Sequence, residues 1–166
     1  MEKLSNISAT TLQADDPGLQ SFSLFSGLGP SELTALLKLT DTRECVAGER
    51  IVSVGEQGLC LYVLLSGRAK VSVGADGGEI VLAHIESGDF FGEVSLVDDG
   101  PRSADVTALE PCTLLRITRM TIGVLGGLQP SAAIQILGAI GSALVARLRA
   151  SNQKYLDILL RKGDQA

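Results

Sequence analysis

A carboxylate and a guanidinium, Glu93 and Arg102, flank a short turn within residues 90–106. This segment predicts a strand, a short helix that opens at Gly92, a tight turn and a second strand. An arginine can bind a phosphate through two parallel hydrogen bonds, and free backbone amides at a helix start attract anions. A carboxylate in the first helical turn can accept a hydrogen bond from a ligand hydroxyl. The segment could therefore bind a sugar and a phosphate together, but its spacing equally suits a structural salt bridge between Glu93 and Arg102.

The rest of the chain offers little catalytic chemistry. Its single histidine, His84, cannot build a metal site that needs several histidines. The three cysteines, Cys45, Cys60 and Cys112, are widely spaced and include no CxxC pair. Such cysteines are typical of buried free thiols in a cytoplasmic protein. We therefore expect no catalytic residue, no metal and no cofactor.

Size and charge narrow the class of protein further. The 166 residues suffice for one domain with its own core. A net charge of −5 disfavours direct DNA binding, because phosphate contacts need a basic face. Aromatic residues make up 4% of the chain and tryptophan is absent, which disfavours a base-stacking surface.

The elements that must position residues 90–106 follow from the pattern along the chain. Residues 1–16 are polar and predict a flexible N-terminal arm, and residues 17–40 predict short helices. Residues 42–119 alternate between short strands and glycine-centred turns, a pattern typical of an antiparallel sandwich or barrel. Within this block, residues 61–65 and 69–73 predict one hairpin, and residues 79–85 return after the turn at residues 76–77. Residues 120–162 predict C-terminal helices, with Pro130 in the first turn of the second.

The long C-terminal helix carries an apolar stripe beside several small residues. The stripe consists of Ile134, Leu137, Ile140, Leu144, Leu148, Tyr155 and Leu159. This pattern predicts a homodimer through the helix, and the alternative is that the stripe packs only on the chain's own barrel. No residue from 120 to 146 is charged, but the apolar piece at residues 132–146 is shorter than the roughly 20 residues of a membrane span. We therefore expect a buried helix at a protein interface and no membrane span.

Residues 91–106 closely resemble the phosphate-binding cassette of the cyclic nucleotide-binding domain family, of the catabolite activator and cAMP-dependent kinase regulatory subunit type. The family pattern of Phe-Gly-Glu, a small apolar residue, Ser/Ala-Leu, a spacer and Pro-Arg-Ser/Ala/Thr-Ala-x-Val is matched without gaps. The resemblance extends over residues 20–162. One departure is Cys60, which replaces a usual polar residue and is expected to alter a surface turn and not the pocket.

The resemblance implies a mainly β fold, an antiparallel β-roll (jelly roll) at residues 42–119 with N-terminal helices and a long C-terminal helix. The whole domain would occupy residues 17–166. Arg102 would pair with the cyclic phosphate, and Glu93 would take the ribose 2′-hydroxyl. The cradle would be completed by backbone amides around Gly92, Val94 and Ala104 and by the Ser103 hydroxyl. Ala69 and Leu82 match positions that line the base pocket, and the match at residues 147–154 places Ser151 and Asn152 against the base.

We therefore expect a cytoplasmic regulatory protein that binds a cyclic nucleotide, with cAMP favoured over cGMP. Ligand binding would reposition the helices, and an unknown effector protein would read the change. The sequence ends about where the family's transcription factors begin their helix-turn-helix, so a stand-alone sensor without direct DNA binding is expected. The alternatives are a nucleotide-free scaffold with the same fold, and a receptor for cGMP or a cyclic dinucleotide. A single histidine excludes a metal-dependent jelly-roll dioxygenase.

Overall fold

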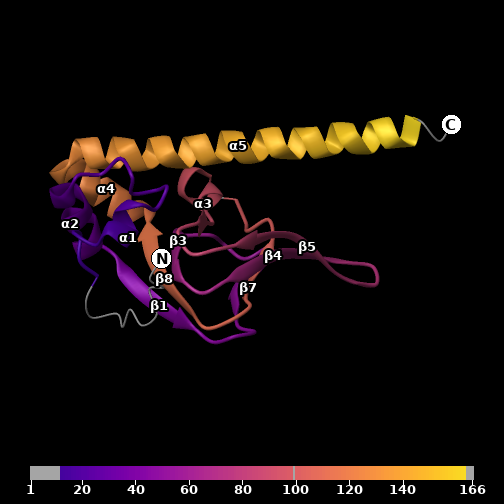
Figure 1. Ribbon diagram of the computed structural model, residues 1–166, viewed down its shortest axis with the longest axis horizontal. Helices are drawn as coiled ribbons and strands as arrows, with labels where there is room; N and C mark the ends of the chain where they lie inside the picture. The colour runs from indigo at the N-terminus through magenta and orange to yellow at the C-terminus, as the bar shows by residue number, and fades with distance from the viewer. Residues whose placement is uncertain (1–11, 99, 164–166) are drawn as a thin grey trace.

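The computed structural model describes residues 12–98 and 100–163, which form two antiparallel sheets with most of the short helices at one end and the long C-terminal helix running along the whole molecule (Figure 1). One sheet has the strand order β1-β8-β3-β6 and the other has the order β2-β7-β4-β5. The strands are β1 (Asp41–Cys45), β2 (Arg50–Val52), β3 (Cys60–Ser66), β4 (Ala69–Ala75), β5 (Gly78–Ile85), β6 (Phe90–Phe91), β7 (Asp105–Ala108) and β8 (Cys112–Thr118). The helices are α1 (Pro17–Gln20), α2 (Pro30–Lys38), α3 (Val94–Val97), α4 (Arg119–Leu128) and α5 (Pro130–Gly163). The predicted β-roll with flanking helices and a long C-terminal helix is confirmed.

The turn after β3 sends the chain from one sheet to the other. β3 pairs with β6 and β8, whereas β4 pairs with β5 and β7. The predicted hairpin between residues 61–65 and 69–73 is therefore wrong. Gly67 permits the turn, because its φ is +94° and an added Cβ would lie 2.5 Å from the carbonyl oxygen of Pro111. The hairpin between β4 and β5 is present as predicted.

The central strand β3 is buried on both faces and contributes to two apolar clusters. Successive side chains of a strand point to opposite faces. One set packs with the helices: Leu61, Val63 and Leu65. The other set packs with residues of the second sheet: Cys60, Tyr62 and Leu64. Each fully buried leucine contributes about 1.5–3 kcal/mol relative to an exposed one, so this strand fixes both the helices and the second sheet.

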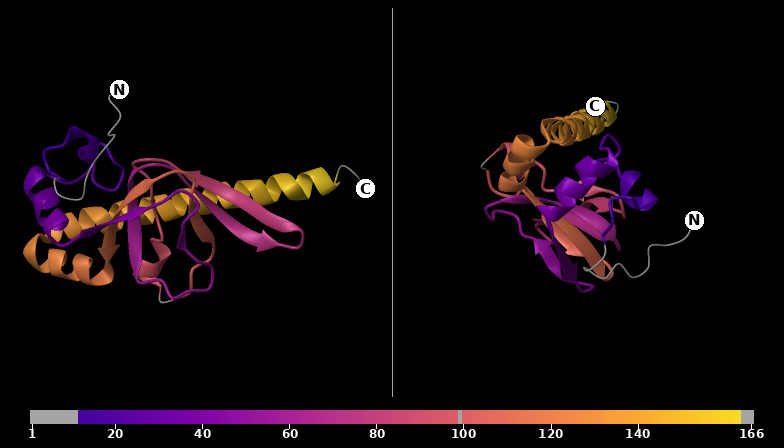
Figure 2. Two further views of the ribbon diagram at one scale, coloured as in Figure 1. Left: turned by 90° about the horizontal axis from the view of Figure 1, so that it is seen from below. Right: turned by 90° about the vertical axis from the view of Figure 1, so that its left-hand side faces the viewer.

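The helix α5 has a packed inner half and an exposed outer half that extends beyond the sheets (Figure 2). Ala132, Ile136 and Ile140 are buried in the cluster beneath the helices, and Ala133 is also buried. From residue 145 to residue 161 every side chain is exposed. Five members of the predicted stripe are exposed: Ile134, Leu137, Leu148, Tyr155 and Leu159. The alternative that the stripe packs only on the chain's own barrel is therefore wrong for these five.

The prediction that the apolar segment at residues 132–146 is too short to span a membrane underestimated the length of the helix. The helix continues through Gln135, and its stretch Pro130–Arg161 is long and apolar enough to span a bilayer by length and composition alone. Only 22% of its most apolar stretch is buried within this chain. The expected burial of the helix at a protein interface would need a partner and stays a prediction. The inner half nevertheless packs on the core, and the outer half carries Arg147, Arg149, Lys154 and Arg161. That no membrane span is present stays a prediction.

The predicted N-terminal arm falls partly outside the described residues, because description begins at residue 12. Leu12 and Ala14 are partly buried against the cluster beneath the helices. The side chain of Asp16 accepts a hydrogen bond from the Gly18 amide at 2.8 Å and so caps α1. Residues 12–16 are therefore packed on the domain.

Candidate functional site

The backbone at Arg102 is pinned to a neighbouring loop. Its amide donates to the Glu56 carbonyl at 2.8 Å, and its carbonyl accepts from the Gly55 amide at 2.8 Å. A β-bridge between Gln57 and Pro101 lies beside these bonds. The residue is 8% exposed, so its guanidinium enters the protein from a fixed backbone position.

The Arg102 guanidinium is held by three acceptors. Nη1 donates to Ser95 Oγ at 3.0 Å and to the Gly92 carbonyl at 3.1 Å. Nη2 donates to the Cys60 carbonyl at 2.8 Å. Nε is buried and has no hydrogen-bond partner. A buried polar atom without a partner is costly, so this atom marks a place where a ligand oxygen would be stabilising.

Two glycines leave the space that the guanidinium occupies. Gly92 has a φ of +79°, and an added Cβ there would lie 2.3 Å from Arg102 Nη1. An added Cβ at Gly58 would lie 1.9 Å from Ser95 Oγ and 3.0 Å from Arg102 Nε. A side chain at Gly92 would displace the arginine, and one at Gly58 would displace Ser95 and crowd the arginine.

The carboxylate of Glu93 lies at the start of α3 and contacts the long C-terminal helix. The residue is 3% exposed. One of its oxygens pairs with Arg147 Nη1, and the other, Oε2, is buried without a partner. Arg147 Nη2 also donates to the Phe90 carbonyl at 2.7 Å, and the Arg147 guanidinium lies 5.6 Å from the centre of the Phe90 ring. Arg147 therefore links α5 directly to the segment that carries Glu93.

The salt bridge between Glu93 and Arg102 that the spacing allowed does not form, because the two side chains have separate partners. Within the described residues, Glu93 Oε2 and Arg102 Nε are the buried side-chain nitrogen and oxygen atoms that lack a hydrogen bond. Both lie in the cassette (residues 90–106). The cassette therefore combines an unpaired donor and an unpaired acceptor, as a ligand with an anionic oxygen and a hydroxyl requires.

Comparison with known proteins agrees with this chemistry. A family model described as "Cyclic nucleotide-binding domain" matches residues 42–125, just over half of the chain. The chain belongs to the cyclic nucleotide-binding domain family. It is 30% identical over 145 residues to the CRP-like cAMP-activated global transcriptional regulator of Mycobacterium tuberculosis, covering 87% of this chain and 63% of that protein.

A solved relative and a larger enzyme share this domain. The crystal structure of the Thermus thermophilus catabolite activator protein is 34% identical with a TM-score of 0.68, covering 82% of this chain and 62% of that one. This chain thus spans less than two thirds of the two regulators' length. It is also 31% identical over 137 residues to Glutaminase 2 of Bradyrhizobium diazoefficiens, which cover 82% of this chain and 21% of that protein. What these comparisons match is a binding domain, and no catalytic family is among the findings.

Three of the remaining predicted site residues lie within the cassette, and Ala69 and Leu82 lie on the second sheet. Val94 begins α3 and is exposed, while Ser103 is exposed and Ala104 half-buried between Arg102 and β7. Ala69 begins β4 and is fully buried. Leu82 is 49% exposed and is the residue skipped by the irregular pairing of β4 with β5. A β-bulge of this kind redirects a side chain.

The two predicted residues of the long helix, Ser151 and Asn152, are exposed and make no described contact with the cassette. Ser151 follows Arg147 by one helical turn, so both lie on the same side of α5. Arg147 itself was not among the predicted site residues. Its position in the sequence could have indicated a role, because Arg147 is the first charged residue after Arg119.

Cys60 also departs from its expected role. It was expected to change a surface turn only, yet it is 7% exposed, and its carbonyl accepts a hydrogen bond from Arg102 Nη2. Its sulfur lies 3.8 Å from the same nitrogen. Beyond it, Tyr62 packs on Phe91 with ring centres 5.5 Å apart, and burial raises the pKa of the Tyr62 phenol.

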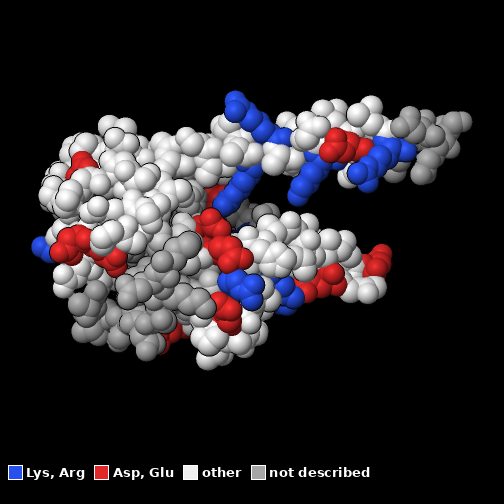
Figure 3. All heavy atoms as spheres, in the orientation of Figure 1, with Lys and Arg blue, Asp and Glu red and all other residues white. Residues whose placement is uncertain are grey.

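Charge and shape around the cassette favour an anionic guest. In the space-filling view, α5 stands clear of the sheets along its outer half, and most of its basic side chains, but not all, point toward the open space above the β4–β5 hairpin (Figure 3). The basic side chains described on this half are Arg147, Arg149, Lys154 and Arg161. Clustered positive charge raises the local concentration of anions.

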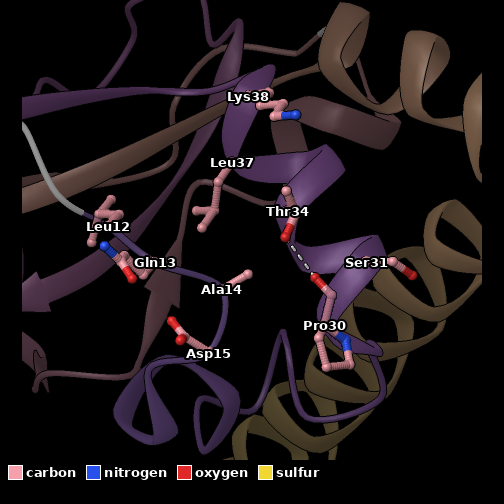
Figure 4. A pocket seen from close by; sticks show the side chains of 9 residues that line it. All are labelled: Leu12, Gln13, Ala14, Asp15, Pro30, Ser31, Thr34, Leu37 and Lys38. Atoms are coloured by element: carbon pink, nitrogen blue, oxygen red, sulfur yellow. Dashed lines mark hydrogen bonds between the residues drawn. The ribbon is translucent and has the colours of Figure 1, made fainter.

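A separate groove lies between residues 12–15 and α2, away from the cassette (Figure 4). It encloses about 530 Å³, and its lining includes Asp15, Thr34, Leu37 and Lys38. The Thr34 hydroxyl donates to the Pro30 carbonyl at 2.8 Å within α2. Both buried polar atoms without partners lie in the cassette and not in this groove, so we place the functional site at the cassette.

Proposed function

We propose that this protein is a cytoplasmic sensor that binds a cyclic nucleotide, with cAMP favoured, and signals by moving its helices. The observation that carries the proposal is the pair of buried, unpartnered atoms Arg102 Nε and Glu93 Oε2 in one short segment. A cyclic phosphate offers an oxygen for the first, and a ribose 2′-hydroxyl offers a donor for the second. The names of the Mycobacterium and Thermus relatives, which refer to cAMP and to catabolite activation, support cAMP as the ligand.

The other contacts follow the same arrangement. The amides near Gly92, Val94 and Ala104 and the hydroxyl of Ser103 would surround the phosphate. The apolar side chains of Ala69 and Leu82 would line the base pocket. Ser151 and Asn152 would contact the base after a movement of α5, because neither contacts the cassette in this structure.

Signalling would depend on two competing interactions of the Glu93 carboxylate. Its carboxylate is paired with Arg147 on α5, and a ribose hydroxyl would bind the same carboxylate. A ligand shifts a conformational equilibrium only through unequal affinity for the two states. Nucleotide binding at Glu93 would therefore change the position of α5 relative to the cassette, and an effector protein would bind the altered surface. No catalytic step is required.

Isothermal calorimetry with cAMP, cGMP and a cyclic dinucleotide tests the ligand. We expect binding to the wild type, and at least about thirtyfold weaker binding to Arg102→Ala, because truncating a buried charge costs more than about 2 kcal/mol. Arg149→Ala removes the same charge from the exposed helix and should bind as the wild type does. Absence of heat with every cyclic nucleotide would overturn the sensor and favour the scaffold.

We further propose that the exposed face of α5 pairs with a second copy of the chain. An isolated helix gains little stability in water without tertiary packing, yet Leu148, Tyr155 and Leu159 are all exposed on this one. Analytical ultracentrifugation should show a dimer for the wild type and a monomer for Leu148→Gln/Leu159→Gln. Met120→Gln, which changes a 78% exposed residue of α4, is the control and should stay dimeric. A monomeric wild type would contradict the dimer.

A further inference from the structure

Ser95 occupies an unusual position between the Arg102 guanidinium and the helix α4. It is 5% exposed and lies in α3, a single helical turn that begins directly after Glu93. Its hydroxyl accepts a hydrogen bond from Arg102 Nη1 at 3.0 Å, and both atoms are buried. No role was assigned to this side chain from the sequence, where it is one of several small residues of the cassette.

The backbone on both sides of Ser95 is fixed. Its amide donates to the Gly92 carbonyl at 3.2 Å. Its carbonyl accepts from Arg119 Nη2 at 3.3 Å, and the next carbonyl, that of Leu96, accepts from Arg119 Nε at 3.2 Å. Arg119 is the first residue of α4. The hydroxyl therefore projects toward Arg102 from a backbone that is held from two directions.

Ser95 is closely packed on its other side by Gly58. An added Cβ at Gly58 would fall 2.6 Å from the Ser95 Cβ, so the serine packs directly on that glycine. With Nη1 and Nη2 of Arg102 bonded to the protein, Nε is the donor of this guanidinium without a partner. Ser95 thus helps to fix which edge of the guanidinium remains free.

We infer that Ser95 is a positioning residue for the ligand-binding guanidinium, which it holds in place before the ligand arrives. This inference rests on the proposed binding of a nucleotide phosphate by Arg102. Ordering a long arginine side chain costs conformational entropy, and a side chain that is already ordered binds its ligand more tightly. Loss of the hydroxyl leaves Arg102 Nη1 with the Gly92 carbonyl alone and releases part of this order.

The test compares Ser95→Ala with Thr121→Ala. Thr121 is a fair control because it is also buried, at 6% exposure, and its hydroxyl also makes hydrogen bonds. It donates to the Leu39 carbonyl at 3.3 Å and accepts from the Thr118 amide at 3.3 Å, and none of its described hydrogen bonds involves Arg102. Affinity for cAMP is measured by calorimetry. In parallel, the Arg102 Nε–H resonance is followed by nitrogen-15 NMR in the ligand-free proteins, which needs no nucleotide.

We expect Ser95→Ala to bind cAMP about tenfold more weakly, as fits the loss of a hydrogen bond to a charged group, and to shift or broaden the Nε–H resonance. Thr121→Ala should change neither. If the wild type binds cAMP and Ser95→Ala binds it with unchanged affinity, the role of Ser95 alone is overturned. The same holds if Thr121→Ala loses as much affinity for cAMP as Ser95→Ala does. If the wild type binds no cyclic nucleotide, the proposed function fails, and the role of Ser95 in ligand binding fails with it.

Discussion

Removing the Arg147 side chain tests the contact between α5 and the cassette. The Glu93 side chain is 4% exposed and the Arg147 side chain 51% exposed. In Arg147→Ala the carboxylate stays buried while its cationic partner is lost. The fold should therefore lose stability at this contact, even though the substituted residue itself lies half in water.

The size of the loss follows from the two exposures. Breaking a fully buried ion pair costs about 3–5 kcal/mol, whereas exposed pairs contribute about 0–1 kcal/mol. One partner here is buried and the other half-exposed, so we expect a loss of about 1–2 kcal/mol. Glu93→Gln removes the charge that Arg147 pairs with. In that background Arg147→Ala still removes the hydrogen bond to the Phe90 carbonyl and the contact with the Phe90 ring, so it should cost less than in the wild-type background but more than nothing.

Urea unfolding of the four proteins of this double-mutant cycle measures the coupling between the two side chains. Arg149→Ala is the matched control, because it removes an arginine of the same helix that is exposed and outside the cassette contacts. A loss in Arg147→Ala equal to that in Arg149→Ala would refute the reasoning. A coupling free energy near zero would refute it as well, since the two side chains would then not stabilise each other.

Three further predictions test the fold and the site. Gly92→Ala should lower the free energy of unfolding by more than about 2 kcal/mol in urea, because the φ of Gly92 is +79° and the new methyl would overlap Arg102. The same substitution should weaken cAMP binding in calorimetry. In the control Gly74→Ala no atom lies within 4 Å of the added Cβ, so its free energy of unfolding should stay within about 0.5 kcal/mol of the wild type. Burial raises the pKa of the Cys45 thiol from 9.0 to about 11, so stability should be intact below pH 9 and fall by about 2 kcal/mol as the pH rises to 11. A Cys45→Ala protein whose unfolding shows the same fall would contradict this cause. Ile140→Ala should lower the free energy of unfolding by about 2–4 kcal/mol in urea, because the Ile140 side chain is 1% exposed. The control is Ile134→Ala, since Ile134 is 70% exposed. An equal loss in the two variants would show that the inner half of α5 is not packed as described.

Local patterns predicted the strands of the β-roll but not their partners. Alternating residues and glycine turns mark each strand because both act over a few residues. Pairing is set by contacts distant in sequence, such as the one that places Cys45 opposite Cys112. The hairpin expected after β3 failed for this reason, since nothing local distinguishes a turn within a sheet from the Gly67 turn between sheets.

The candidate site also has a part that the sequence predicted and a part that it did not. Glu93 and Arg102 were predictable because the cassette is continuous in sequence and its residue types have a specific chemistry. Their partners were not, because Arg147 is 54 residues from Glu93 and Cys60 is 42 residues from Arg102. The exposure of the apolar stripe on α5 was equally hidden, because a stripe on a helix shows that a face is apolar and not which surface covers it.

The outer half of α5 converts a small rotation into a large displacement. A helix rises 1.5 Å per residue, so Arg161 lies about 21 Å along the axis beyond Arg147, where the helix meets the cassette. A tilt of about 5° at that contact would carry the far end through about 2 Å. If the proposed nucleotide binding at Glu93 tilts α5 about its ion pair with Arg147, the far end of the helix would therefore move by more than a bond length.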